Sequence, residues 1–418
     1  MKTQILFIKS FCISICLMSI SLVAHGQTGL FYYANPSQKY VNNKLLSLTQ
    51  APNQEIYLLG KTSTATYEEA VPYFARIDKR GNLLLDKIIE KKHIYDMTDI
   101  FISSEQQVVV FGSSRQGPIF APWWSTLKAS GDIAREKNDY VVYSTILNDV
   151  VPLGGDEYVL AETRMDNNKV YNVHLVKINS ITDEVVWSKK VESTQNEEAS
   201  KIIKLNDGNL LVIGKKYNSS LSDFSAVLYK INSSGKALWR VSVPVPDNFY
   251  AQAVAEDSNG KLVYMCSYSK ESMGTNETRV LRLDANGQKE RYNVILDMSS
   301  NGLVMRPDNN FVLYGSSIMV QSERAVTKGK YVVVDANLQQ VYEYTLSETD
   351  KPDAQMPEDV RKNLPTNSDI ISGMLLQDGR IALAGRIHMP VNPQKASSYG
   401  VDRNNLGLLL LLDANGRF

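Results

Sequence analysis

The sequence predicts an all-β fold, a seven-bladed β-propeller built from four-stranded antiparallel blades. The first observation is a short β-rich run, apolar at alternate positions, that recurs seven times and mostly closes on Asp or Asn. The gaps between successive closing residues are 51, 50, 53, 52, 51 and 78 residues. A self-similar unit of about 50 residues with four strand signals is typical of a propeller blade. The closing residues are Asp78, Ala129, Asn179, Asn232, Asp284, Asp335 and Asp413.

The second observation is that the last unit is incomplete. Its third strand, residues 408–412, is followed only by the turn residues 413–418, so a fourth strand is missing. Residues 30–33 form a β-rich run before the first complete unit and have no partner there. Pairing these two runs closes the ring and removes two exposed sheet edges. The count is then seven blades, whereas an open array or a six-bladed ring leaves both runs without a partner.

The N-terminus has the pattern of a secretory signal peptide. It begins with two lysines, continues with the apolar residues 13–23, and places small residues at Ala24 and Gly26. We therefore expect cleavage after residue 26 and an exported protein, periplasmic or extracellular. Residues 27–418 form one predicted propeller domain. Its predicted blades are about 44–94, 95–144, 145–194, 195–246, 247–297, 298–349 and 368–418, with the N-terminal strand 29–36 added to the last.

The fullest unit shows the order of strands within a blade. Residues 200–205, 210–214, 225–231 and 237–243 are its four predicted strands, joined by turn signals such as Asn-Asp-Gly-Asn. The second strand of each unit ends on a small residue in most blades, which we attribute to crowding near the propeller axis. These residues are Gly60, Gly112, Ala161, Gly214, Cys266, Gly315 and Gly385.

Composition excludes some partners. The chain has 45 Lys and Arg against 45 Asp and Glu, and removal of the two signal-peptide lysines leaves a net charge of about −2. A nucleic-acid-binding protein needs a clustered basic excess, so we expect no nucleic-acid partner. No later stretch is apolar enough for direct membrane insertion. Only Cys266 follows the signal peptide, which excludes an internal disulfide. We expect a monomer or a subunit of an envelope complex.

No catalytic or cofactor motif is present. The sequence has no Gly-x-Ser-x-Gly elbow, and no histidine has a second ligand at metal-binding spacing. We therefore predict no catalytic residue, no metal and no cofactor. Acidic residues are plentiful, so a pair of carboxylates of the kind found in glycosidases stays open as an alternative.

The repeats resemble those of secreted bacterial β-propellers with quinoprotein-like or WD40-like units, and the resemblance covers nearly all of residues 27–418. It rests on the order of turns and strands. Residues 233–239 are similar to the Asp-box turn of sialidases, but the Asp expected two residues before Gly235 is missing and Trp239 comes one residue late. Kelch repeats need a glycine doublet in every blade, and only Gly154-Gly155 occurs. Quinoprotein dehydrogenases carry a disulfide between adjacent cysteines beside the cofactor, whereas this chain has only Cys266 after the signal peptide. The resemblance therefore implies the fold and no activity.

Long links between second and third strands define a candidate binding face. In a four-stranded meander these links emerge on one side of the disc, where loops on a rigid scaffold commonly bind partners. The links are residues 61–72, 113–122, 215–223, 267–278 and 387–405.

Two places on this face are candidate binding sites. Phe120, Trp123 and Trp124 lie in a run with Pro118 and Pro122, and they offer large, stiff contact area for a sugar ring or a protein anchor. The alternative is that the tryptophans begin the third strand and pack between blades. Tyr399 and Arg403 lie in the longest link, beside an insertion over residues 350–367.

We therefore interpret the chain as a non-catalytic secreted propeller that binds a protein or glycan partner through its long-loop face. One alternative is a polysaccharide hydrolase or lyase with acidic residues at the mouth of the central channel. A further alternative is a structural subunit of a cell-envelope or secretion assembly. The fold does not choose among these, because propellers host all of them.

Overall fold

A computed structural model of the chain describes residues 29–33, 42–64, 70–89, 91, 93–138, 144–191, 196–220, 223–243, 245, 249–270, 275–321, 324–346, 367–390 and 403–418. The predicted signal peptide and nearly all of the predicted insertion over residues 350–367 lie outside the described residues. Within the described residues every regular element is a strand, and none of these residues forms a helix that could span a membrane.

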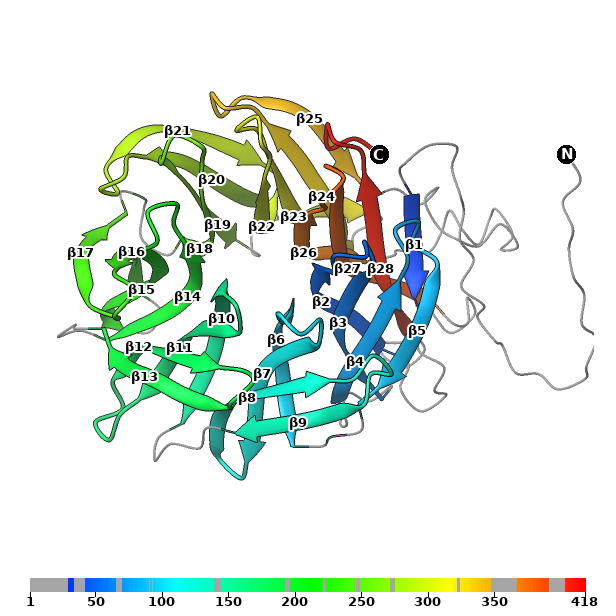
Figure 1. Cartoon of the computed structure of the whole chain (residues 1–418). Coiled ribbons are helices and arrows are strands. Elements are labelled where there is room, and N and C mark those ends of the chain that lie inside the picture. Colours follow the sequence, from blue (N-terminus) through cyan, green and yellow to red (C-terminus); the bar gives the residue numbers. More distant parts are fainter. Residues whose placement is uncertain are drawn as a thin grey trace, which may run out of the picture.

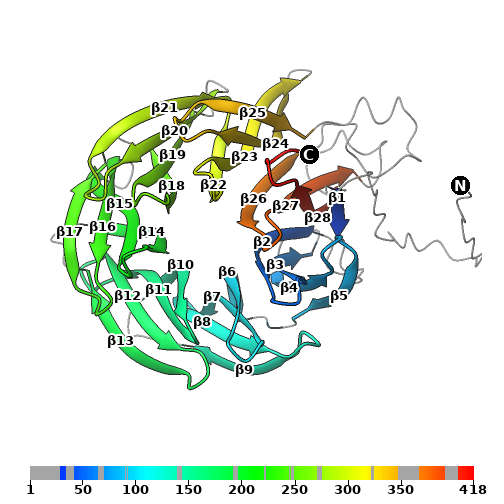
Figure 2. The ribbon, with the colours of Figure 1, turned by 45° about the horizontal axis from the view of Figure 1, so that its top comes forward.

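The strands form seven four-stranded antiparallel blades arranged in a ring (Figure 1), which confirms the predicted fold. Within each blade the first strand is innermost, and the fourth strand lies at the rim (Figures 1 and 2). Blade 1 contains β2 (Asn42–Gln50), β3 (Ile56–Ser63), β4 (Ala70–Ile77) and β5 (Leu83–Ile88). Blade 2 contains β6 (Ile94–Ile102), β7 (Val108–Gln116), β8 (Ile119–Leu127) and β9 (Ile133–Asn138). Blade 3 contains β10 (Thr145–Gly154), β11 (Glu157–Met165), β12 (Tyr171–Asn179) and β13 (Glu184–Lys190).

The remaining blades follow the same plan. Blades 4 and 5 contain β14 (Glu197–Lys204), β15 (Leu210–Ser220), β16 (Asp223–Ile231) and β17 (Ala237–Ser242); and β18 (Tyr250–Glu256), β19 (Leu262–Lys270), β20 (Thr275–Leu283) and β21 (Lys289–Leu296). Blades 6 and 7 contain β22 (Ser299–Met305), β23 (Phe311–Gln321), β24 (Arg324–Val334) and β25 (Gln340–Thr345); and β26 (Ser368–Leu375), β27 (Ile381–Pro390), β28 (Arg403–Leu412) and β1 (Gly29–Tyr33).

Seven hydrophobic clusters fill the seven interfaces between neighbouring blades. Each cluster takes side chains from two blades, so the middle strands of every blade are buried on both faces. This explains why second strands such as Leu210-Leu-Val-Ile213 are apolar at consecutive positions and do not alternate. Cys266 belongs to the cluster between blades 4 and 5, and burial raises its pKa to about 12.

The Asp or Asn that closes most repeats forms the turn after the third strand. Its side-chain oxygen accepts hydrogen bonds from the backbone N–H groups two and four residues later, at 2.8–3.1 Å, in five of the blades. This bonding holds the tight turn and explains the recurring residue type. In blade 2 the equivalent position is Lys128 and not Ala129, because Lys128 makes the backbone bonds that Asp78 makes in blade 1.

The N-terminal strand closes the ring as predicted. β1 pairs antiparallel with β28, with Leu30 opposite Leu410 and Tyr33 opposite Gly407. β1 also contacts blade 1. The Tyr33 hydroxyl donates a hydrogen bond to the Gly81 carbonyl at 2.8 Å, and the Phe31 ring fills the space where a Gly81 side chain would lie.

Each first strand contains a β-bulge at the same place. The register with the second strand shifts by one residue there, so one residue of the first strand has no partner opposite it. The bulged residues, in blade order, are Leu46, Thr98, Asn148, Ser200, Gln252, Asn301 and Ile371.

The bulge explains the small residue of the second strand, and the predicted cause was wrong. In five blades a glycine lies opposite the residue before the bulge, and a Cβ there would come within 1.9–2.5 Å of a first-strand carbonyl oxygen. The close approach is therefore within the blade and not between blades at the axis. In blade 3 the residue opposite the one before the bulge is Glu162 and not the predicted Ala161, because Leu147 pairs with Glu162.

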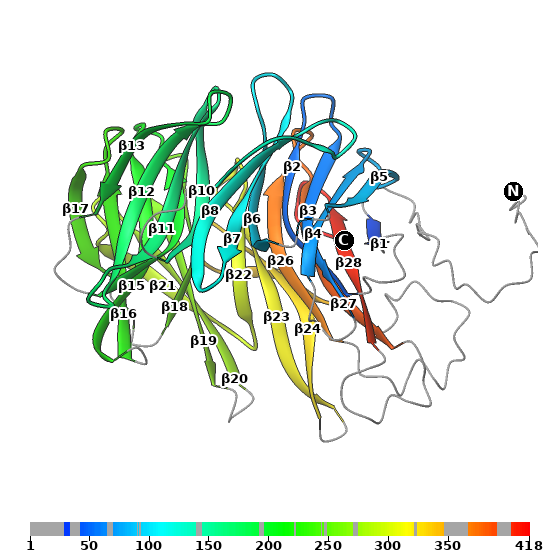
Figure 3. The same ribbon diagram turned by 90° about the horizontal axis from the view of Figure 1, so that it is seen from below.

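Three of the predicted long links, residues 113–122, 215–223 and 267–278, are largely strand in the part that the structure describes. Gln116 pairs with Ile119, Ser220 pairs with Asp223, and Lys270 pairs with Thr275, so the second and third strands stay paired almost to their tips. These ladders project beyond the neighbouring blades on one side of the ring, which we call the hairpin face (Figure 3). The projecting parts lose the apolar pattern because no neighbouring blade covers them, and the sequence there resembles a loop.

Deletion of residues 27–36 tests the closure. The deletion exposes the edge of β28 and removes the buried side chains of Leu30, Phe31 and Tyr33, which should cost several kcal/mol of unfolding free energy. Thermal and urea unfolding of the truncated and full chains would measure the loss. An unchanged melting temperature would show that β1 does not hold the ring closed.

Candidate functional site

Trp123 and Trp124 lie in the interior. Their side chains are 0% and 1% exposed, and as neighbours on β8 they point to opposite faces of blade 2. Trp123 packs in the cluster between blades 1 and 2, and Trp124 packs in the cluster between blades 2 and 3. The Trp124 indole N–H donates a hydrogen bond to Asp183 at 3.2 Å. The alternative interpretation, packing between blades, is therefore correct, and the expectation of exposed tryptophans is wrong.

The other predicted binding residues are not gathered into one site. Phe120 is half-buried near the tip of the β7–β8 hairpin, with its ring edge-on to Tyr95 at a centroid distance of 4.8 Å. The Arg115 guanidinium lies 5.3 Å from the Phe120 ring centroid. Tyr399 lies outside the described residues. Arg403 is the first residue of β28, and its side chain also lies outside the described part of the chain.

The residues that follow the bulges form an axial ring, defined as Ser47, Asp99, Asp149, Lys201, Ala253, Gly302 and Ser372. Two carboxylates of this ring connect the first strands of four blades. Asp99 accepts hydrogen bonds from the Ser47 hydroxyl and from the Val150 N–H, each at 3.2 Å. Asp149 accepts one from the Ile202 N–H at 2.8 Å and pairs with the Lys201 ammonium at 2.9 Å.

Asp99 is buried and lies near the charges of Asp149 and Lys201. Burial, followed by the charge of Asp149, raises the pKa of Asp99 to about 8, so this carboxyl holds its proton near neutral pH. Asp149 in turn raises the pKa of Lys201, which stays charged. The Lys201 side chain is 42% exposed, so it reaches solvent at the axis while it pairs with Asp149.

Tyr314 reaches the same ring from a second strand. A side chain at Gly302 would overlap the Tyr314 hydroxyl, and one at Gly373 would lie 2.9 Å from its ring, so the two glycines leave room for it. Burial raises the pKa of Tyr314 to about 12, whereas the nearby Lys201 lowers it. The axis therefore holds two carboxyls, one ammonium and one phenol.

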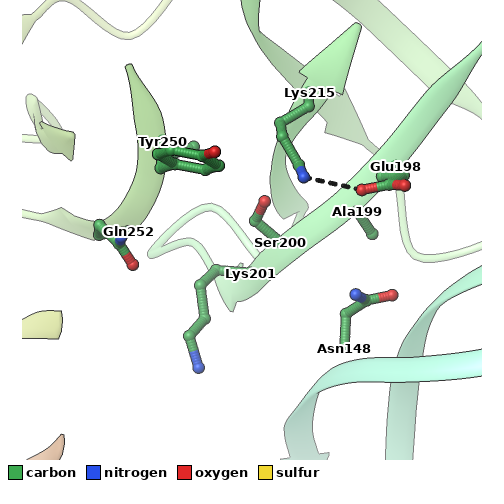
Figure 4. A pocket seen from close by; sticks show the side chains of 9 residues that line it. Asn148, Glu198, Ala199, Ser200, Lys201, Lys215, Tyr250 and Gln252 are labelled. Atoms are coloured by element: carbon green, nitrogen blue, oxygen red, sulfur yellow. Dashed lines mark ion pairs between the residues drawn. The ribbon is translucent and has the colours of Figure 1, made fainter. Parts of the chain in front are cut away.

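A pocket of about 240 Å³ opens beside this ring at blades 3 to 5 (Figure 4). Three consecutive bulges supply it with polar groups, namely the amide of Asn148, the hydroxyl of Ser200 and the amide of Gln252. Tyr250 forms one wall and is 48% exposed. The other residues that line the pocket are Glu198, Ala199, Lys201, Lys215 and Ala251.

Lys215 fixes the aromatic wall of the pocket. Its ammonium lies 5.5–5.6 Å from the ring centroids of Tyr217, Phe224 and Tyr250, and it pairs with Glu198 at 2.9 Å. Cation–π contacts with three rings, together with one ion pair, hold these side chains in place. Phe224 and Tyr250 are 5.0 Å apart between centroids, so Tyr250 is backed by a buried ring. The pocket thus has a rigid, half-exposed aromatic face opposite hydrogen-bonding groups.

A second set of equivalent residues surrounds the axis on the hairpin face. We call it the mouth ring, and it comprises the first-strand residues two positions before each bulge. Its members are Lys44, Asp96, Ile146, Glu198, Tyr250, Ser299 and Asp369.

Sequence reasoning missed these rings because they are defined by the bulges. The glycine that ends a second strand is the signal that the sequence offers. In five blades this glycine lies opposite the first-strand residue before the bulge, so the mouth residue is one position before that residue and the axial residue is two positions after it. His, Cys, Asp and Glu side chains do not form a group of three or more placed to hold a metal ion anywhere in the described residues.

Comparisons with known proteins support the fold. No protein-family model matches the chain, and no curated protein sequence matches it. A protein of unknown function from Dyadobacter fermentans DSM 18053 superposes with a TM-score of 0.51 at 11% identity, over 91% of this chain and 97% of its own. The polysaccharide lyase Uly1 superposes with a TM-score of 0.51 at 9% identity, over 91% of both chains.

Raptor from Chaetomium thermophilum superposes with a TM-score of 0.51 at 7% identity, over 92% of this chain and 29% of Raptor. At these identities the likeness shows the architecture alone. The chain is a seven-bladed β-propeller, and no family model supports the resemblance to quinoprotein-like or WD40-like repeats at a finer level.

Trp123→Ala should reduce stability. The substitution removes a fully buried indole from the cluster between blades 1 and 2, and such losses cost about 3–5 kcal/mol. Urea unfolding of the variant would measure the cost. Unfolding like that of the natural chain would mean that this ring does not hold the two blades together.

Asp99→Asn should remove a pH dependence of stability. The folded pKa of Asp99 is raised from 3.8 to about 8, so its favourable contribution is complete below about pH 4 and is lost as the pH rises through about 8. The natural chain should therefore lose stability relative to Asp99→Asn across this window. Melting temperatures of both proteins from pH 4 to 9 would test this, and two parallel curves would contradict the raised pKa.

Proposed function

We propose that this chain is an exported glycan-binding propeller that holds a sugar residue in the pocket between Tyr250 and the bulged residues of blades 3 to 5. The observation that carries the proposal is the half-exposed Tyr250 ring, which is fixed by Lys215 and faces polar groups. An aromatic face packs against the C–H side of a sugar ring, while amides and hydroxyls bond its hydroxyl groups.

The size of the pocket supports a single ring. Its volume of about 240 Å³ is below the ~300–1,000 Å³ typical of sites for drug-sized ligands. The pocket opens at the axis on the hairpin face, so neighbouring units of a longer glycan have room to continue along that face. A protein anchor would need a larger apolar surface than the one Tyr250 offers.

Glycan cleavage is the second candidate, and one observation favours it. Asp99 holds a proton near neutral pH while Asp149 lies beside it, which is the combination that a general acid and a charged partner require. The polysaccharide lyase Uly1 has the same fold. We place binding first because both carboxylates already bond backbone N–H groups of the next blade and so have a structural role.

Tyr250→Ala tests the binding proposal. Loss of the aromatic face should weaken binding of an oligosaccharide by about thirty-fold, which corresponds to ~2 kcal/mol. Screening of a panel of plant, algal and bacterial oligosaccharides would identify a ligand, and calorimetry would compare the variants. Tyr292→Ala is the matched control, because Tyr292 is 57% exposed on the outer strand β21 and should leave affinity unchanged. Failure of all oligosaccharides to bind, or equal affinity in Tyr250→Ala, would overturn the proposal.

A further inference from the structure

Two lysines face each other at the mouth ring in blade 1. Lys44 of β2 lies directly opposite Lys61 of β3, an arrangement of like charges that destabilises a sheet. Lys61 has acceptors, since its ammonium donates to the Tyr95 carbonyl at 2.6 Å and lies 3.6 Å from Asp96. The Lys44 ammonium forms no hydrogen bond or ion pair with the residues that the structure describes. Its charge is therefore left without a direct partner.

An arginine of the neighbouring blade lies beside this pair. Arg386 of β27 is opposite Asp369 of β26, and both strands pack against β2. The Nε atom of Arg386 is buried and has no hydrogen-bond partner within the described chain. Asp369 attracts Arg386 electrostatically, and its carboxylate also accepts a hydrogen bond from the Asn301 amide at 2.9 Å. A buried donor without a partner is costly, so the residues that the structure describes do not fully satisfy this guanidinium.

The local charge balance is positive. Burial, followed by the charge of Arg386, lowers the pKa of Lys44, and Lys61 lowers it further, whereas Asp369 and Asp96 act in the opposite direction. Three cations thus meet two carboxylates at the junction of blades 7 and 1. Burial raises the pKa of Asp369, whereas the charges of Arg386 and Lys44 act in the opposite direction.

We propose that Lys44 and Arg386 form an anion subsite for an oxyanion of the bound glycan, either the carboxylate of a uronic acid or a sulfate ester. This inference rests on the proposed function and names its substrate class, an acidic polysaccharide. The planar guanidinium of Arg386 presents paired donors to an oxyanion, and Lys44 adds a point charge.

The position of the subsite suits a glycan that crosses the mouth. Lys44 and Tyr250 are equivalent members of the mouth ring, and their strands β2 and β18 lie on opposite sides of the axis (Figures 1 and 2). One sugar unit on Tyr250 and an acidic unit at Lys44 would therefore belong to one chain laid across the ring.

The test compares matched oligosaccharides. Calorimetry at low ionic strength would use hexamers of galacturonic acid, of sulfated galactose and of neutral galactose. Each acidic hexamer that the subsite accepts should bind at least about tenfold more tightly than the neutral one, and added sodium chloride should reduce the difference. Lys44→Gln and Arg386→Gln should each lose about tenfold in affinity for that acidic hexamer and none for the neutral one. Lys289→Gln, an exposed lysine on β21, is the matched control and should change neither.

A second readout needs no glycan. Sodium sulfate, compared with sodium chloride at equal ionic strength, should raise the melting temperature of the natural chain more than that of the two variants. Equal shifts in all three proteins would overturn the subsite. Equal affinity for acidic and neutral hexamers, with binding still lost in Tyr250→Ala, would also overturn it while leaving the proposed function intact. A sulfate-specific shift without any oligosaccharide binding would support the subsite and refute glycan binding.

Discussion

Every blade of this propeller is buried on both faces, and this constraint determines where chemistry can occur. Seven apolar clusters lie between neighbouring sheets, so the middle strands have almost no position that is free for a ligand. The adjacent residues Trp123 and Trp124 show the effect, because they enter two different clusters from one strand. Polar groups are left with three places, which are the inner edge, the projecting hairpins and the rim.

The bulge in each first strand organises the inner edge. It brings a first-strand carbonyl against the backbone of the second strand, which requires glycine in five of the blades. It also directs the next residues toward the axis, where Asp99 and Asp149 bond the backbone of the following blade. Four of the seven positions, Ser47, Asp99, Asp149 and Lys201, therefore connect adjacent blades through polar contacts.

Much of the architecture could be predicted from the sequence because its causes are local. The Asp or Asn of each repeat makes a turn that depends on a few neighbouring residues, and the leftover strand at each end indicated the closure. The candidate site depends on register, which local patterns do not reveal. Asn148, Ser200 and Gln252 are about 50 residues apart and show no shared residue type, so only the paired structure identifies them as equivalent. Tyr314 was missed for the same reason, since its access depends on Gly302 and Gly373 on other strands.

The closure by β1 has a consequence for how the chain reaches its folded state. β1 precedes every other described strand in the chain, yet its partner β28 is the last of the described strands. Six blades can form from contiguous segments, whereas the seventh must wait for both ends of the ring, a contact of very high sequence separation. Until then β1 has an unpaired edge, and blades 1 and 6 each present an apolar face that blade 7 will cover. Moving residues 29–33 to follow residue 418 would make the seventh blade contiguous and convert this slow, long-range step into the formation of a local sheet.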